Sequence, residues 1–332
     1  MWTVDDPERF AALSGDLECL LRETYRLWDP GWVSFTWRGY TYDHVQRVRR
    51  LATHLCVIEG GDARVIELAA LLHDITKLFD GEIIIDANGA RVVDEAGFWR
   101  NHIRRPDRQN KVTALYDRLN LTGKLHSESG AAIARELLRE RGFDEASCER
   151  VAETIRHHLR PPSNAPLESL CLFDADTIDA NIGMPSFIRN IYIHLHMYDV
   201  RRSPEAPPVA QVLRETPRDY LEPYITERLP TWAAGKQKDF VPRLRTESGR
   251  SIALARLERL EYLFSHLARE LTAGEPMDER NCLGAVVHLM SSGEDPSISD
   301  ETAHLADGWL TTATSEAQWF VQHLLAETRG AE

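Results

Sequence analysis

The stretch Val65-Ile-Glu-Leu-Ala-Ala-Leu-Leu-His73-Asp74-Ile-Thr-Lys77 decides how this chain is interpreted. Its first part is apolar on nearly every side and follows Asp62, a good helix-capping residue, so we expect a buried helix. That helix brings His73 and Asp74 into the protein interior. Burying an isolated carboxylate is costly unless something compensates for its lost hydration, and an adjacent imidazole and carboxylate can reach one metal ion. The stretch therefore predicts a metal site.

Helical periodicity continues on both sides of this stretch. Apolar residues recur at three- and four-residue spacing over 42–59, where His44 lies on the same face as Val48 and Leu51. Further helices are expected over 127–141, 144–159, 167–180 and 248–271. In contrast, residues 82–86 and 90–94 are β-rich and flank a turn at 87–89, which predicts an inserted hairpin. The fold class is therefore all-α: a helical bundle with an inserted β-hairpin and a helical C-terminal extension.

The predicted domain organisation follows these elements. We expect one domain over 1–275, with an insert at about 80–125, and a helical appendage over 276–332. Residues 203–245 are richer in proline and turns than their neighbours. The insert is unusually basic, because residues 98–124 carry five arginines and two lysines against two aspartates in a chain of net charge −13. That insert is either a solvated loop or a lid that gathers phosphate groups.

Composition restricts the class of protein. With 332 residues, 43% of them hydrophobic, the chain is long enough to bury a full core. An acidic chain makes a duplex nucleic-acid partner improbable, because phosphate neutralisation needs clustered Lys and Arg. The N-terminal twenty residues lack the features of a secretory signal, and no apolar run is long enough to span a bilayer. The five cysteines are scattered without a C-x-x-C pair. We expect a cytoplasmic protein without a membrane partner, and self-association stays open.

Further candidate ligands lie on other predicted helices. His158 shares a face with Val151 and Ile155, whereas the neighbouring His157 lies on the more polar face, so His158 is the better candidate. Asp174 and Asp176 point in roughly opposite directions on a helix, so only one of them should face a given site. Periodicity alone does not decide between these two acids.

The ordered set of histidines and aspartates resembles the HD superfamily of metal-dependent phosphohydrolases. It comprises His44, then His73-Asp74 followed by Ile-Thr-Lys77, then His126 and Ile155-Arg-His-His158, then Asp174-Ala-Asp176. The resemblance implies that His44, His73, Asp74 and Asp176 bind a divalent metal (Mn, Mg, Fe, Co or Ni). It also implies that His126 and His158 hold a second metal, as they do in members with two metals. Departures from smaller relatives are the insert at 80–125 and the residues after 275.

The function implied by this resemblance is hydrolysis of a small phosphorylated, nucleotide-like metabolite by a metal-activated water. Asp74 is the expected bridge between two metals, and Lys77 is expected to contact a phosphoryl oxygen or the attacking water. Arg104, Arg105 and Arg189 are expected to bind the substrate phosphate through their guanidinium groups.

Two alternatives use the same residues. A di-iron oxygenase has an overlapping ligand set, and a regulatory or binding module could keep the metal for structure alone.

Overall fold

The computed structural model describes residues 7–31, 36–95, 97–202, 209–277, 280–291 and 295–330. The chain divides into two compact units, Met1–Phe173 and Asp174–Glu332. The predicted domain boundary at 275/276 stays a prediction. In the part of the chain that the structure describes, no helix has the length and apolar character needed to cross a membrane.

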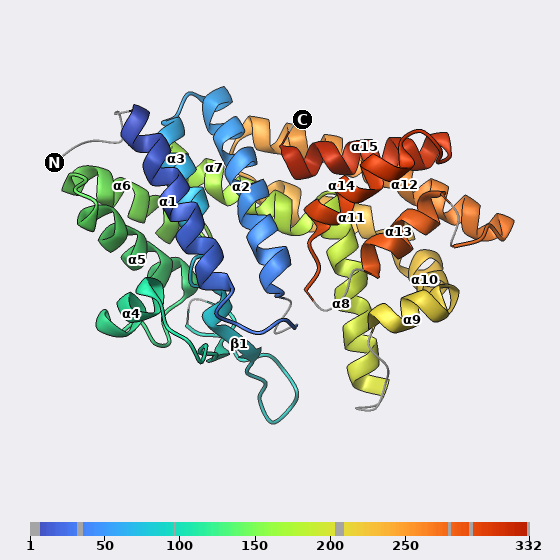
Figure 1. Cartoon of the computed structure of the whole chain (residues 1–332), viewed down its shortest axis with the longest axis horizontal. Helices are drawn as coiled ribbons and strands as arrows, with labels where there is room; N and C mark the ends of the chain where they lie inside the picture. Colours follow the sequence, from blue (N-terminus) through green and yellow to red (C-terminus); the bar gives the residue numbers. More distant parts are fainter. Residues whose placement is uncertain are drawn as a thin grey trace. The chain divides into compact units, whose positions relative to one another are not determined.

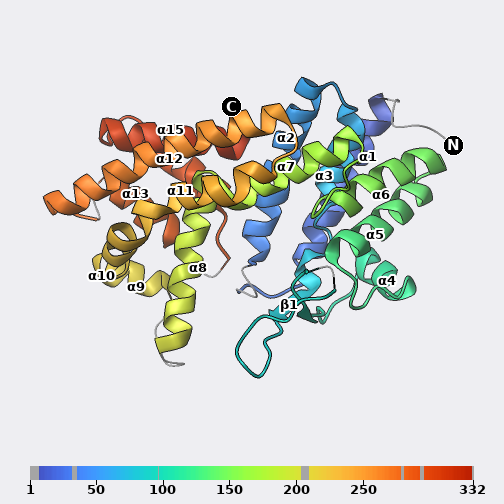
Figure 2. The same ribbon diagram turned by 180° about the vertical axis from the view of Figure 1, so that it is seen from behind.

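The first unit is built mainly from helices, as the sequence predicts (Figure 1). In chain order they are α1 (Pro7–Tyr25), α2 (Arg38–Glu59), α3 (Ala63–Leu72), α4 (Lys111–Arg118), α5 (His126–Glu140) and α6 (Glu145–His157). Helix α7 (Leu167–Asn181) runs across the boundary into the second unit. Both views place α5 beside α6 (Figures 1 and 2). The fold is thus all-α with a small β insert.

Helix α3 forms where the largely apolar run predicts it. The Asp62 side chain caps it by accepting hydrogen bonds from the backbone amides of Arg64 and Val65, at 3.1 and 3.2 Å. Its buried residues, which include Ile66, Leu68 and Leu71, lie on every side of the helix and are at most 1% exposed. Helix α3 is therefore central in the first unit, and the His73-Asp74 pair comes directly after it.

The insert contains the predicted hairpin turn, but its strand pairing extends further than expected. Strand β1 (Asp80–Ile83) pairs antiparallel with β2 (Asn101–Ile103), whereas residues 82–86 and 90–94 are joined only by the isolated bridge Ile85–Arg91 and its adjoining turn. Gly89 has φ +77° in that turn, a conformation that favours glycine. The reason for the difference is that residues 98–103 return to the start of the insert and supply the longer ladder. The segment between β1 and β2 extends away from the helices (Figure 1).

The second unit is also helical. It contains α8 (Met184–Arg202), α9 (Val209–Glu215), α10 (Pro217–Pro223), a π-helical turn (Tyr224–Arg228), α11 (Leu229–Phe240), α12 (Glu247–Ala273), α13 (Cys282–Met290), α14 (Ile298–Trp309) and α15 (Ser315–Arg329). Residues 203–208 of the proline-rich stretch lie outside the described residues, and its described part, 209–245, forms short helices joined by turns.

A buried ion pair links distant parts of the second unit. Nη1 of Arg256 on α12 lies 4.0 Å from Oε2 of Glu327 on α15 and donates to the carbonyl of Ile182 at 3.2 Å. The Glu327 carboxylate also accepts from the backbone amide of Met184 at 2.8 Å. Since both charged side chains are almost fully buried, these contacts compensate for their lost hydration. The residues after 275 therefore pack into the same compact unit as α12.

Candidate metal centre

Four histidines of the first unit surround the carboxylate of Asp74. They come from the start of α2 (His44), the end of α3 (His73), the start of α5 (His126) and the end of α6 (His158). All four rings and the carboxylate are buried, with 0 to 7% exposure. Residues far apart in the sequence thus converge on one acid, as the metal hypothesis requires.

The two oxygens of Asp74 face different pairs of histidines. Oδ2 lies 3.8 Å from Nε2 of His44 and 3.7 Å from Nε2 of His73. Oδ1 lies 3.6 Å from Nε2 of His126 and 3.8 Å from Nε2 of His158. Atoms that bind the same ion at about 2.1 Å lie roughly 3 to 4 Å from each other, so each spacing fits a shared ion. The geometry therefore offers two adjacent positions for a metal, with Asp74 common to both.

Backbone carbonyls orient two of these rings. Nδ1 of His73 lies 2.7 Å from the carbonyl oxygen of Ala70, and Nδ1 of His158 lies 2.7 Å from that of Ile155. A carbonyl only accepts, so Nδ1 carries the proton and donates it in both contacts. The lone pair is consequently on Nε2, the atom that faces Asp74. This tautomer is the one that a histidine needs to bind a metal through Nε2.

A second carboxylate supports His126 from the outside. Oδ2 of Asp80 lies 2.9 Å from Nδ1 of His126 and 3.2 Å from Nζ of Lys77, whose ammonium is in turn 3.4 Å from the same Nδ1. Burial raises the pKa of Asp80, but the stronger combined effect of Lys77 and His126 lowers it to about 2. Asp80 is therefore an anion that fixes both side chains.

The charge state of Asp74 follows from its surroundings. Burial alone would raise its pKa, yet His73, His126, Lys77 and His158 together hold the pKa far below its usual range. The Tyr25 hydroxyl donates to the backbone carbonyl of Asp74 at 2.7 Å, and burial raises the pKa of Tyr25, which keeps this donor protonated. Asp74 is thus an ionised, positioned carboxylate. A set of imidazole nitrogens and a carboxylate suits Mn, Fe, Co, Ni or Zn, and carboxylate with water suits Mg.

The sequence-predicted residues divide into those that meet at Asp74 and those that do not. His44, His73, His126 and His158 meet there, and Lys77 reaches this cluster through Asp80. His157 is half-buried, and its Nδ1 lies 3.3 Å from the Ser169 hydroxyl instead.

The two acids of the Asp174-Ala-Asp176 run lie in the second unit. Asp174 accepts hydrogen bonds from the amides of Arg245 and Thr246, at 2.8 and 2.7 Å, and from the Thr246 hydroxyl at 2.6 Å. Its carboxylate therefore anchors the start of α12. Asp176 is half-buried on α7.

The predicted substrate-binding arginines lie in different settings. Arg105 is exposed and forms an ion pair with Asp117 and a hydrogen bond to the Thr122 hydroxyl at 2.8 Å. Arg104 is half-buried at the end of β2 and lines a pocket with Asp80. Arg189 lies in the second unit near Lys236, whose pKa is lowered to about 8 by burial and by the Arg189 charge.

Sequence reasoning missed two residues of the centre, Asp80 and Tyr25. The signal for Asp80 was its position three residues after Lys77, a spacing that lets the two side chains meet within one turn. Tyr25 left no local signal, because its hydroxyl reaches a backbone carbonyl 49 residues further along the chain.

Comparison with known proteins points to one family. Residues 41–181 match the model of the HD domain. Among solved structures, the chain is similar to a predicted HD superfamily hydrolase from an uncultured Thermotogales bacterium, with 20% identity and a TM-score of 0.42 over 77% of this chain and 92% of that one. It is also similar to Bacillus subtilis YpgQ in complex with ADP, with 17% identity and a TM-score of 0.40 over 80% of this chain and 97% of that one. No curated protein matches the chain in sequence.

Proposed function

Because residues 41–181 belong to the HD domain family, we propose that this protein is a metal-dependent phosphohydrolase acting on a small phosphorylated, nucleotide-like metabolite. The observation that carries this proposal is the arrangement around Asp74, in which each carboxylate oxygen faces its own pair of histidines. A carboxylate shared between two adjacent cation positions is suited to phosphoryl transfer, because two ions can stabilise the attacking and the leaving oxygen.

We assign the ligands by position. His44 and His73 would hold one ion with Oδ2 of Asp74, and His126 and His158 would hold the other with Oδ1. Asp176 is proposed as a further ligand of the first ion, on the basis of the resemblance of the Asp174-Ala-Asp176 run. Support for this choice over Asp174 is that the Asp174 carboxylate is occupied by three donors at the start of α12.

The chain itself would orient the phosphoryl group. Divalent ions held at this centre would supply Lewis-acid stabilisation of phosphoryl oxygens and would lower the pKa of water toward neutrality. Lys77 would bring an ammonium to the edge of the centre, where Asp80 limits its movement. Arg104, Arg105 and Arg189 are proposed to bind other substrate oxygens, and Arg104 is favoured over Arg105 because Arg105 already pairs with Asp117.

A metal and substrate screen tests the proposal. The protein is purified, its metals are quantified, and phosphate release from a panel of phosphorylated metabolites is measured with Mn, Mg, Fe, Co and Ni in turn. We expect turnover with at least one metal and its loss in Asp74→Ala. An exposed acid of the insert turn, Asp86, supplies the control Asp86→Asn, which should retain turnover. Silence across the panel with every metal contradicts the proposal, and iron-dependent O₂ consumption would replace it with the oxygenase alternative.

A further inference from the structure

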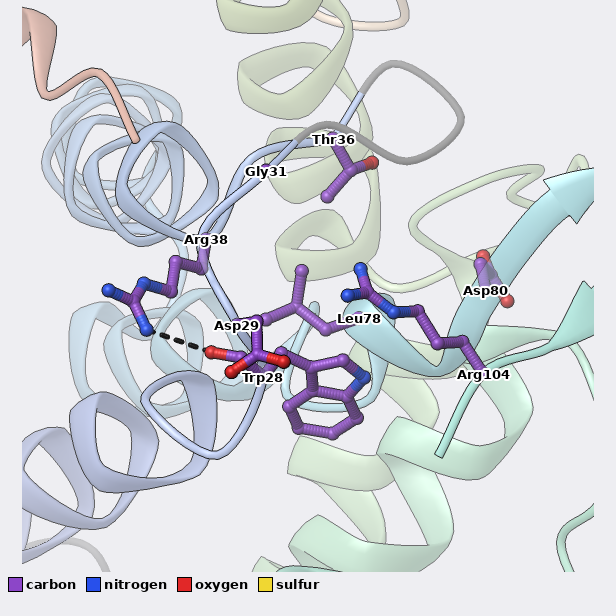
Figure 3. A pocket seen from close by; sticks show the side chains of 8 residues that line it. All are labelled: Trp28, Asp29, Gly31, Thr36, Arg38, Leu78, Asp80 and Arg104. Atoms are coloured by element: carbon purple, nitrogen blue, oxygen red, sulfur yellow. Dashed lines mark hydrogen bonds between the residues drawn. The ribbon is translucent and has the colours of Figure 1, made fainter. Parts of the chain in front are cut away.

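A small pocket of the first unit lies next to the metal centre, and the two share the residue Asp80. It is lined by Trp28, Asp29, Gly31, Thr36, Arg38, Leu78, Asp80 and Arg104 (Figure 3). Asp80 belongs to both features, since it lines the pocket and its carboxylate contacts Nδ1 of His126 at 2.9 Å.

One residue that lines the pocket, Trp28, carries a buried donor that has no partner among the described residues. Trp28 is only 3% exposed, and its indole Nε1 has no hydrogen-bond partner among the described residues. The ring has an edge contact with Phe79, at 5.0 Å between centroids, and the Trp28 backbone is held by the Arg38 guanidinium, which donates to the Trp28 carbonyl at 2.8 Å. An unsatisfied buried donor opposes folding, so an acceptor supplied by a ligand would recover that cost.

Arg104 adds a charged donor to the same pocket. Its backbone amide donates to the Phe79 carbonyl at 2.9 Å, which fixes the position from which the side chain starts. The guanidinium forms no hydrogen bond or ion pair with any other described side chain, and Figure 3 shows it extending into the space above the Trp28 ring. In contrast, Arg38 is turned the other way, toward the Trp28 carbonyl. An indole N–H and a guanidinium are both pure donors, so together they select an anionic acceptor.

The acids of the pocket do not reverse this preference. The Asp80 carboxylate already accepts from Lys77 and His126. Asp29 is exposed at the rim, where solvent and salt screen its charge. The buried part of the pocket therefore favours an anion.

We propose that this pocket binds a second phosphoryl group of the substrate, so that the substrate class is a compound with two linked phosphoryl groups rather than a simple monoester. This inference rests on the proposed phosphohydrolase function. One phosphoryl group would lie at the Asp74 centre, and the other would accept hydrogen bonds from Trp28 Nε1 and the Arg104 guanidinium. Trp28 and Arg104 thereby determine which phosphorylated compounds bind well.

Binding of two non-hydrolysable probes tests this pocket independently of turnover. Methylenebisphosphonate carries two phosphonyl groups and methylphosphonate carries one, and their affinities for the Mn-loaded protein are measured by calorimetry. The variants are Trp28→Phe, which keeps the ring and removes the N–H, and Arg104→Ala. We expect each variant to weaken methylenebisphosphonate binding about tenfold, as for loss of a hydrogen bond to a charged group, and to leave methylphosphonate binding within about twofold. Circular dichroism and thermal melts check that each variant is folded.

Three controls define the location of the pocket, its charge preference and the kind of group that it binds. Arg100→Ala removes an exposed arginine of the same insert and should change neither affinity. Asp29→Asn should leave methylenebisphosphonate binding unchanged or tighten it, whereas weaker binding would indicate a pocket for cations. Phosphonoacetate, whose second group is a carboxylate, should bind less well than the bisphosphonate, and equal binding overturns the phosphoryl assignment.

Other outcomes separate this inference from the proposed function. If the native protein prefers methylenebisphosphonate and both variants keep the full preference, the bisphosphonate acts through the metals alone and the pocket assignment is wrong. Equal affinity of the native protein for the two probes also overturns it. In either case, phosphate release from monoesters would still support the phosphohydrolase. Conversely, a preference that is lost in both variants of a protein without turnover would leave the pocket established and the proposed reaction refuted.

Discussion

The Asp80 carboxylate lies 2.9 Å from Nδ1 of His126, on the side of the ring opposite to Asp74. It fixes the ring orientation that points Nε2 at Oδ1 of Asp74, and its charge makes the imidazole a stronger donor to a metal. His73 and His158 rely on neutral carbonyls for the same purpose. The two cation positions are therefore electrostatically different.

Replacing Asp80 with Asn should weaken metal binding at the position formed by His126 and His158. Loss of the charged partner of a metal-binding histidine typically costs about 10- to 100-fold in affinity or activity, and we expect a loss in that range. Calorimetric titration of the metal-free protein with Mn measures this affinity. Asp86→Asn, an exposed acid of the same insert, is the matched control and should bind as the native protein does. Equal affinity in Asp80→Asn would remove the support role of Asp80.

Substitution of Asp174 should lower the stability of the protein, whereas substitution of Asp176 should lower its metal content. Asp174→Ala removes the acceptor of three hydrogen bonds at the start of α12, so we expect a loss of about 3 kcal/mol in the free energy of unfolding. Asp176→Ala should instead lower the metal content with a smaller effect on the metal-free protein. Urea denaturation and metal analysis of both variants check the pair. Normal metal content in Asp176→Ala would refute its proposed role as a ligand.

Gly130 should matter because α5 approaches the His73-Asp74 segment closely. A Cβ atom at Gly130 would lie 3.0 Å from the carbonyl oxygen of His73, closer than ordinary van der Waals contact. Overpacking typically costs about 1 to 3 kcal/mol, which exceeds the gain of about 1 kcal/mol for alanine in a helix. We expect Gly130→Ala to lower the free energy of unfolding.

The control for this substitution lies in the same unit. Gly15 is an exposed glycine of α1, with no atom within 4 Å of an added Cβ, so Gly15→Ala should stabilise the protein by about 0.5 to 1 kcal/mol. Urea denaturation compares the two variants. If both were equally stabilising, α5 would have room to move and the close approach would not constrain the metal centre.

These contacts indicate what the sequence could and could not predict. The burial of His73-Asp74 was predictable because a helix that is apolar on nearly every side is typical of a protein interior, and a polar pair at its end needs a compensating partner. The helical face of His44 and the choice of His158 over His157 followed from periodicity of 3.6 residues. The pairing of β1 with residues 101–103 was not predictable, because the hairpin signal at 87–89 concerns only neighbouring residues. The contact of Asp80 with His126 and the surroundings of Trp28 depend on tertiary structure, which no local pattern records.

Lys236 should make stability depend on pH. Its pKa is lowered to about 8 by burial and by the Arg189 charge, from a value of about 10.4 in an unfolded chain. Between these two values the unfolded state binds more protons than the folded state, so the free energy of unfolding should rise as the pH increases from 8 to 10. At pH 7 the lysine is charged in both states, and its burial opposes folding.

Lys236→Met isolates this effect, since it keeps a long chain against Trp232 and Phe240 and removes the charge. We expect the variant to be more stable than the native protein at pH 7 by about 1 kcal/mol, a discounted value because the side chain is half-exposed to screening solvent. The difference should shrink as the pH approaches 10, where the native lysine loses its proton. Urea denaturation of both proteins from pH 7 to 10 measures it. Tyrosines and cysteines titrate in the same range but are common to both proteins, so a difference that stays constant with pH would show that the Lys236 ammonium is not destabilised by the fold.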